Sequence, residues 1–460
     1  MERREFNTQF TGAVWQMTIF CSILTFLGIL YLVLPVENVS VEEKRRLTPF
    51  PELTIEAIKS GDFMDSLDSY AADHFPFRKM FMGVSIFLKS KKGVVNEKEI
   101  FYTNVDAIDQ LPSVEKNKHP TEIQKIEGDS KNSKGLVVLN GQAFQLFTND
   151  HPQNKKLANI VNSYARFFND SVKIFNLIVP TPTDFMLKNE YQEYIGLEKE
   201  NILETEDKLS KSINKVYVYD ELMKHKDQYV FFRTDHHWTA LGAYYGYVAF
   251  CHSKGITPIK LSEMEKSQLN EKFLGTHYLK TKDAKLALNP DKIEYWIPPL
   301  EPKAVRYKEG VSEKIPVYKK EGIEINPYLL FLGGDEPIIE LKSKEIRNNK
   351  TVLIIKNSYG NPFSPYLTAN FENVIVMDYR YTDKSVKDAV SEYKVSDIII
   401  LNGVFSANTI SHLNRLQDIL TLQNTDQNNT FVKRKKSIKK KSVDKEKNQE
   451  LITSDTNNLN

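Results

Sequence analysis

Five short apolar runs restrict what this chain can fold into. They lie at residues 172–179, 328–332, 351–355, 374–377 and 397–401. Each run is nearly continuous, all but 328–332 are rich in β-branched residues, and segments of helix length or more separate them. Such runs are typical of strands that are buried on both faces of a sheet. The sequence therefore predicts an α/β fold in which helices cover both sides of a mainly parallel sheet.

The size and composition of the chain exclude some classes of protein. A chain of 460 residues can bury a large core, as one large domain with insertions or as two domains. A net charge of +2 is too small to indicate a nucleic-acid partner. The two cysteines, Cys21 and Cys251, cannot form a disulfide framework, and they leave the cellular compartment open.

Residues 13–36, which follow a short tail at 1–12, are almost wholly apolar. About 20 such residues cross a bilayer as a helix, and Trp15 and Tyr31 stand near the two ends as interfacial aromatics would. No small-residue cleavage site follows, so we predict an uncleaved transmembrane anchor rather than a signal peptide or a buried core helix. Arginine and lysine residues flank the span on both sides, so the charges do not indicate its orientation.

The remaining chain divides by composition. Residues 37–102 are expected to form a membrane-proximal arm with short helices, in which Asp73, His74 and Arg78 are structural polar residues. Residues 103–134 are polar and predict a surface insertion, and residues 135–420 hold the α/β domain. Residues 421–460 are polar and basic, which predicts a disordered tail with a weak attraction to anionic polymers or lipid headgroups.

The most informative motif lies at residues 229–239, where an apolar run ends in a polar cluster. Asp235 and His237 stand two residues apart. In an extended segment this spacing points both side chains to one side and His236 to the other. A carboxylate beside an imidazole is the orienting half of a Ser-His-Asp catalytic unit.

A candidate nucleophile follows the third apolar run. Ser358 stands between a predicted buried strand and a predicted helix, at the edge of the sheet where ligands bind. Asn361 is expected to cap that helix, and Pro362 suits its first turn. The free amides of the helix would then favour a developing oxyanion beside Ser358.

Together the two motifs resemble the DHHW protein family, which is similar to the SGNH-like acetyltransferases of alginate and related exopolysaccharides. The resemblance extends from about the anchor to residue 420, and it is carried by residues 233–238 and 354–361. It implies an SGNH-hydrolase-like, flavodoxin-like, three-layer α/β/α fold with a circularly permuted motif order. It also implies that Asp235 and His237 are the Asp-x-His pair and that Ser358 is the nucleophile. The domain would lie outside the cytoplasm on a single-pass anchor and act on a cell-surface polysaccharide.

Several other polar positions allow two interpretations. In this fold class the oxyanion donors include a glycine amide and an asparagine, for which the candidates are Gly334, Gly275 and Asn402, although each is also consistent with an ordinary turn. Tyr359 could face a substrate or pack inward. Arg233 could hold an acidic substrate group or form a structural salt bridge.

Three classes of function are compatible with these residues. The first is a serine O-acetyltransferase or acetylesterase that uses no cofactor and no metal, with a membrane acyltransferase as a possible supplier of acetyl groups. The second is a metal-dependent phosphoesterase, because an Asp-His-His string also occurs in that class, but the predicted neighbouring strand end at 180–184 lacks a second acidic pair. The third is a non-catalytic glycan-binding or scaffold protein. The polymer, and the choice between transfer and hydrolysis, stay open.

Overall fold

A computed structural model describes residues 2–33, 36, 39–40, 45–78, 80–81, 84, 88, 100–103, 125–127, 135–148, 152–169, 171–187, 195–299 and 301–422. Most of the predicted insertion at 103–134 and the predicted tail from 423 onward lie outside these residues.

An eight-stranded sheet forms the centre of the α/β domain, with the strand order β12-β11-β13-β15-β14-β16-β7-β8. The five strands from β15 to β8 run parallel, and β13, β11 and β12 extend the sheet in antiparallel pairs. The predicted α/β fold with a mainly parallel sheet is therefore confirmed. The strands are β7 (Lys173–Val179), β8 (Ile213–Val216), β11 (Lys303–Lys308), β12 (Val311–Ile315), β13 (Ile338–Lys342), β14 (Thr351–Lys356), β15 (Asn373–Asp378) and β16 (Asp397–Gly403).

The order of the parallel strands indicates where on the sheet a ligand site is expected. If counting begins at β14, the order β15-β14-β16-β7-β8 reads 2-1-3-4-5, which is the flavodoxin-like order. The order reverses between β14 and β16, and ligands bind outside the carboxyl ends of strands at such a switch point. The chain enters this sheet at its fourth strand, because β7 and β8 come first in the sequence.

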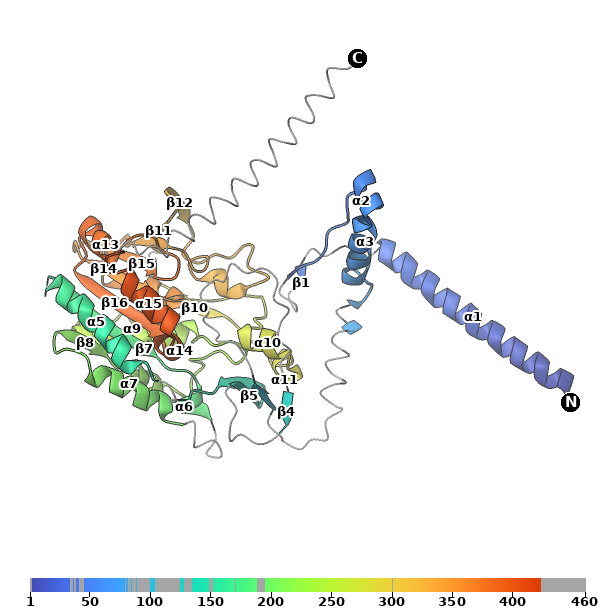
Figure 1. Ribbon diagram of the computed structural model, residues 1–460, viewed down its shortest axis with the longest axis horizontal. Helices are drawn as coiled ribbons and strands as arrows, with labels where there is room; N and C mark the ends of the chain where they lie inside the picture. The colour runs from blue at the N-terminus through green and yellow to red at the C-terminus, as the bar shows by residue number, and fades with distance from the viewer. Residues whose placement is uncertain are drawn as a thin grey trace, which may run out of the picture.

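Helices cover both faces of the sheet. On β7, Phe175 and Leu177 belong to one core with α9 (Ala240–Lys254), whereas Ile174 and Ile178 belong to a second core with α5 (Asn154–Phe168). The second core also holds α13 (Val386–Tyr393) and α15 (Ile410–Asp418). Figure 1 shows α5 and α15 on the same side of the sheet. The side-chain alternation of a strand thus separates two apolar layers.

Shorter elements complete the domain. The helices are α6 (Thr183–Met186), α7 (Leu197–Asp207), α8 (Val218–Lys224), α10 (Thr276–Thr281), α11 (Ala284–Ala287), α12 (Gly360–Phe363) and α14 (Val404–Ala407), with the 3₁₀ turns η2 (Leu261–Glu263), η3 (Pro327–Leu330) and η4 (Ser364–Ala369). A small sheet of order β4-β3-β5-β6 holds β3 (Ile100–Thr103), β4 (Lys125–Glu127), β5 (Gly135–Leu139) and β6 (Gln142–Gln145). A separate pair joins β9 (Glu265–Gln268) to β10 (Glu294–Ile297).

One of the five predicted strands is wrong. Residues 328–332 do not join the sheet but fall largely in the 3₁₀ turn η3. Pro327 opens this turn, since its fixed φ suits a first helical position and it has no amide to donate to a strand ladder. Leu332, Gly333 and Gly334 then adopt positive φ, so the chain bends where a strand would continue. The other four runs form β7, β14, β15 and β16.

The N-terminal region stands apart from the α/β domain (Figure 1). Helix α1 (Glu2–Val33) already begins within the predicted tail at 1–12, and its apolar window Val14–Tyr31 is long enough to cross a membrane and is not buried. Helices α2 (Ile55–Ser60) and α3 (Asp62–Asp73) follow, after a short pairing of β1 (Val39–Ser40) with β2 (Arg45–Arg46). Gly61, in the left-handed conformation, separates the two helices. The Asp73 carboxylate accepts the amide and hydroxyl of Thr48, so it has a structural role.

Candidate active site

The segment with the Asp-His-His string is a closed loop, not an extended strand. Phe231 and Trp238 form an isolated antiparallel bridge, and the Thr239 amide donates to the Val230 carbonyl at 2.9 Å. Helix α9 begins directly afterwards, where the Thr239 hydroxyl caps it by accepting from the Gly242 amide. The loop is therefore fixed at both ends, and its side chains do not follow strand alternation.

A buried carboxylate from a distant part of the chain organises this loop. Asp291 accepts from the amides of Arg233 and Thr234 at 2.9 and 2.8 Å, and from the Thr234 hydroxyl at 2.6 Å. The Tyr229 hydroxyl donates to the same carboxylate. Because donors from both the backbone and side chains converge on it, Asp291 holds the loop in one conformation.

The loop and the turn after β14 bring three predicted site residues together. The Nδ1 atom of His237 lies 2.6 Å from Oδ1 of Asp235, and its Nε2 atom lies 2.7 Å from Oγ of Ser358. All three side chains are buried or nearly so. Ser358 lies two residues after the end of β14, beside the switch point of the sheet. The three residues form a continuous hydrogen-bonded relay from a carboxylate through an imidazole to a hydroxyl.

The second oxygen of Asp235 is held by α10. Thr276 donates to Oδ2 from its amide at 2.7 Å and from its hydroxyl at 3.0 Å. Gly275 allows this approach, since a Cβ atom there would lie 2.2 Å from the Asp235 Cβ. Burial raises the pKa of Asp235, but His236, His237 and the Thr276 amide outweigh it and hold this pKa well below its usual range. The carboxylate is therefore kept ionised.

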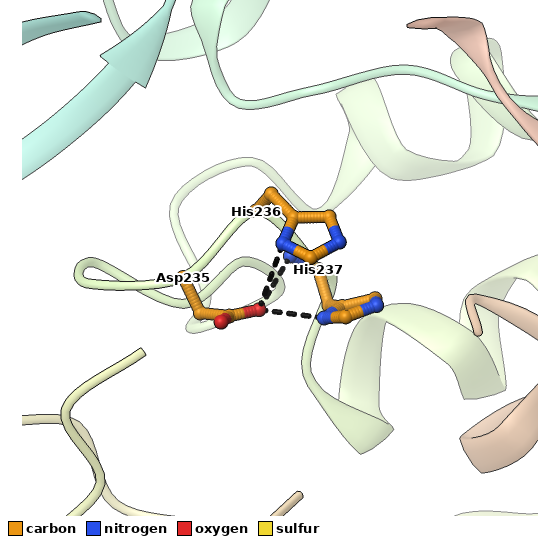
Figure 2. Close-up of side chains that lie close together, drawn as sticks. All are labelled: Asp235, His236 and His237. Atoms are coloured by element: carbon orange, nitrogen blue, oxygen red, sulfur yellow. Dashed lines mark hydrogen bonds and ion pairs between the residues drawn. The ribbon is translucent and has the colours of Figure 1, made fainter. Parts of the chain in front are cut away.

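His236 does not point away from the other two residues as the alternation rule predicted. Its Nδ1 atom lies 2.7 Å from the Thr276 hydroxyl and 3.5 Å from Oδ1 of Asp235, and its ring centroid is 3.7 Å from that of His237. Figure 2 shows both imidazoles beside the same carboxylate. The prediction failed because the closed loop folds consecutive residues onto one side. Of the two histidines, His237 contacts Ser358.

The turn after β14 that contains Ser358, called the nucleophile turn below, differs from its prediction in two respects. Helix α12 begins at Gly360, so Asn361 lies inside it and is not the N-cap. The amides of Gly360 and Asn361 donate to the carbonyls of Asn357 and Ser358, and the Tyr359 amide donates to the Asn357 side chain. These amides are thus engaged within the turn, and a helix of one turn does not direct them at an oxyanion. Pro362 lies in the first turn, as predicted.

Two further contacts join the loop to the nucleophile turn. The Trp238 indole donates to the Tyr359 carbonyl at 2.9 Å, and the Tyr359 hydroxyl donates to the His236 carbonyl at 2.5 Å. Trp238 is fully buried and packs beside Phe363 of α12. These reciprocal bonds set the distance between His237 and Ser358.

A cluster of ion pairs beside the end of β14 holds the nucleophile turn in place. The Lys356 ammonium, two residues before Ser358, contacts Asp378 at 2.9 Å and Asp335 at 3.1 Å. Arg380 pairs with the same two carboxylates, and the Asn361 amide group donates to Asp335 at 2.9 Å. Burial raises the pKa of Asp335, but the two cations prevail and lower it below its usual range. Charges of both signs balance, which makes their burial tolerable.

The remaining predicted positions lie as follows. The amides of Gly334 and Gly275 donate to the Phe331 carbonyl and the Thr234 hydroxyl. Asn402 is buried in β16, and Tyr359 is buried against Gly403. The Arg233 guanidinium lies 3.4 Å from Asp291 and donates to the Pro290 carbonyl. Thus Arg233 forms a structural salt bridge between the loop and Asp291, and Tyr359 packs inward.

Asp235, His236 and His237 also form the one group of three possible metal ligands found among the residues that the structure describes. Donor atoms that share a zinc ion at about 2.0–2.1 Å lie roughly 3.3 Å apart in a tetrahedral site. The 2.6 Å separation of Asp235 Oδ1 and His237 Nδ1 is instead that of a direct hydrogen bond. The geometry therefore fits a proton relay better than a metal centre.

Three contributors to the site were missed in the sequence. Asp291 and Thr276 lie 40 to 60 residues beyond the loop that they hold, and no local pattern distinguishes them. Tyr328, whose ring stacks on His237 with the centroids 4.1 Å apart, lies in the run that was predicted as a strand. The proline before Tyr328 was the available signal for a turn.

The fold and the site define an α/β protein with a serine-histidine-aspartate relay at the switch point of its sheet. Comparison with known proteins gives the family. A protein-family model described as DHHW protein matches residues 96–377, so the chain belongs to the DHHW family. The resemblance drawn from the two motifs is confirmed. A comparison with curated proteins found no match.

Solved structures agree with this assignment. A DHHW family protein from Eubacterium siraeum is 26% identical, with a TM-score of 0.57 over 64% of this chain and 98% of that chain. PatB1 of Bacillus cereus, solved with a sulfonyl adduct, is 17% identical, with a TM-score of 0.51 over 61% of this chain and 97% of that chain. The PatB1 similarity concerns the fold alone.

A third histidine beside the site gives a prediction about stability. His277 is buried in α10, and burial lowers its pKa to about 4, against the opposing effect of Asp235. The unfolded chain takes up this proton near pH 6.5, so stability should fall as the pH drops from 6.5 towards 4. Between pH 7 and 4.5, wild type should lose about 2–3 kcal/mol of unfolding free energy that His277→Gln does not lose.

Denaturant unfolding at the two pH values measures this difference. His252→Gln, an exposed histidine at the end of α9, is the control and should lose as much stability as wild type. Equal losses in wild type and His277→Gln would show that His277 does not resist protonation in the fold.

Proposed function

We propose that this protein is a serine O-acetyltransferase or acetylesterase that works through an acyl-serine intermediate. The observation that carries the proposal is the relay from Asp235 through His237 to Ser358, with hydrogen bonds of 2.6 and 2.7 Å. Its buried carboxylate is ionised and accepts from Nδ1 of the imidazole, which leaves Nε2 to accept the proton of Ser358.

Each residue has a defined part in the reaction. As the Ser358 Oγ attacks the acyl carbonyl, His237 Nε2 takes its proton, and the positive imidazole is stabilised by Asp235. The same proton then passes to the leaving oxygen, and the acyl group stays on the serine. In the second half, His237 deprotonates a sugar hydroxyl or water, which attacks the acyl-serine and restores Ser358 with the proton on its oxygen.

The developing oxyanion needs donors that the turn itself does not use. We assign this role to the Ser358 amide and to Asn402. Leu401, the residue before Asn402, pairs in register with Lys356, so Asn402 stands beside the nucleophile turn. Since the amides of Gly334 and Gly275 are engaged elsewhere, they are not part of this assignment.

The acetyl group, the acceptor and the location follow from the resemblance to exopolysaccharide acetyltransferases. The apolar window of α1 would anchor the protein, with the α/β domain outside the cytoplasm and a cell-surface polysaccharide as acceptor. Because acetyl-CoA is cytosolic, a membrane acyltransferase partner would supply the acetyl groups. The order of the parallel strands, with the serine strand β14 as strand 1, supports a permuted SGNH-like arrangement. Comparing acetylation of the surface polymer in cells with and without the chain tests the biological role.

The nucleophile can be tested by substitution. Ser358→Ala should lower the turnover of an activated acetyl ester by roughly four to six orders of magnitude, because the other relay members act only through the serine. Ser364→Ala is the matched control, since Ser364 is a buried serine in the following turn whose hydroxyl donates to the Gly360 carbonyl. Near-normal activity in folded Ser358→Ala would remove the proposal, whereas no turnover in folded wild type would favour a non-catalytic glycan-binding protein.

Substitution of each of the two adjacent histidines distinguishes a proton relay from a metal site. His237→Ala should cost about as much turnover as loss of Ser358, and Asp235→Asn about 10⁴-fold, because the wrong tautomer is then held. His236→Ala should chiefly lower stability, since His236 contacts Thr276 and Asp235 but not the serine. Turnover is measured for each folded variant with and without a chelator. Equal loss in both histidine variants, together with loss by chelation, would indicate a metal site instead, as the phosphoesterase alternative requires.

A further inference from the structure

Tyr328 contacts two members of the relay at once. Its ring lies parallel to the His237 imidazole, with the centroids 4.1 Å apart and an angle of 15° between the planes. Its hydroxyl donates to the carbonyl of Ser358 at 3.0 Å. The side chain thus joins the base to the backbone of the nucleophile, in addition to the bond between His237 and Ser358.

The surroundings of Tyr328 hold it in this position. It is buried, 6% exposed, and lies in the 3₁₀ turn that Pro327 opens. Phe232, Phe273 and Phe331 surround its ring at centroid distances of 5.5 to 6.4 Å. The turn is also tied to its neighbours, since Leu332 donates to the Val317 carbonyl and Lys319 donates to the Leu330 carbonyl. A ring held in this way can fix the plane of the imidazole.

We propose that Tyr328 is a positioning residue for the relay, an inference that rests on the proposed function. Its ring keeps the His237 plane aligned with Ser358 and stabilises the imidazolium that forms during acyl transfer, because the face of an aromatic ring attracts a cation. Its hydroxyl fixes the Ser358 backbone, so that the Oγ stays within reach of Nε2. The two parts of one side chain therefore have separable effects.

The effect on the base has a definite sign. The ionisable groups around His237 are Asp235 and His236 in the loop, His277 in α10, and Tyr359 in the nucleophile turn. Replacing Tyr328 by an aliphatic residue leaves these groups in place and removes the aromatic face together with the hydroxyl, and Tyr328→Phe removes the hydroxyl alone. The imidazolium should then lose an attraction, so the apparent pKa of the base should fall. For a desolvated cation–π contact the expected fall is about 0.4 to 1.5 pH units.

The hydroxyl can be removed without disturbing the ring. Tyr328→Phe loses the bond to the Ser358 carbonyl, which still accepts from the Asn361 amide at 3.1 Å and so stays paired. This variant should keep the apparent pKa of wild type. Its rate should fall by a modest factor, about 3- to 10-fold, as expected for a lost hydrogen bond between neutral groups.

The test is the reaction of Ser358 with phenylmethanesulfonyl fluoride, followed across pH by mass spectrometry of the Ser358 peptide. The serine Oγ displaces fluoride from sulfur, and His237 takes up the serine proton. The full chain is used as wild type, Tyr328→Phe, Tyr328→Leu and Tyr318→Leu. Tyr318 is the matched control, because it is also 6% exposed and its hydroxyl also donates to a backbone carbonyl, at 2.9 Å, but that carbonyl belongs to Trp296.

The expected result is a lower apparent pKa and a rate about 10- to 100-fold lower in Tyr328→Leu, with the wild-type pKa in both Tyr328→Phe and Tyr318→Leu. If Tyr328→Leu does not fold, Tyr328→Met replaces it, since methionine fills the space without an aromatic face. An unchanged pH profile in the folded aliphatic variant would overturn the inference while leaving the proposed function intact. Absence of reaction at Ser358 in wild type would overturn the proposed function, and the inference with it.

Discussion

The hydrogen bond between His237 and Ser358 is the contact on which the site depends. It joins residues 121 positions apart in the chain, from a loop before α9 and a turn after β14. The loop does not determine where the turn lies, and the turn does not determine where the loop lies. Both must therefore be fixed for His237 Nε2 and Ser358 Oγ to lie 2.7 Å apart. Much of the polar structure buried around the site serves this requirement.

The polar contacts form two supports and a connection between them. Asp291 holds the loop through three bonds from Arg233 and Thr234, and buried ion pairs around Lys356 hold the nucleophile turn. The indole of Trp238 and the hydroxyl of Tyr359 then tie the two segments together. Buried charges stabilise a fold little in net terms, but removing one partner is costly, so such networks favour one geometry. A preorganised relay is what acyl transfer needs, because it leaves little to rearrange during the reaction.

The sequence was sufficient for features with a local signal. Continuous apolar runs identified β7, β14, β15 and β16, and the placement of Ser358 after β14 follows from them. Local patterns were insufficient where the chain curves. The run at 328–332 has the composition of a strand, but Pro327 and the positive φ of Leu332 turn it away from the sheet. For the same reason strand alternation misplaced His236, which the closed loop brings beside Asp235. The partners Asp291 and Thr276 depend on tertiary contacts, for which a single sequence carries no periodic signal.

The central claim, a covalent acyl-serine at the switch point of the sheet, can be measured directly. Wild-type protein is incubated briefly with an activated acetyl ester, quenched in acid, digested and mapped by mass spectrometry. One acetyl group should appear on the peptide that contains Ser358, and it should disappear when an oligosaccharide acceptor is added before the quench. Turnover of the ester with no acetyl group on that peptide, or with the group on another residue, would contradict the claim.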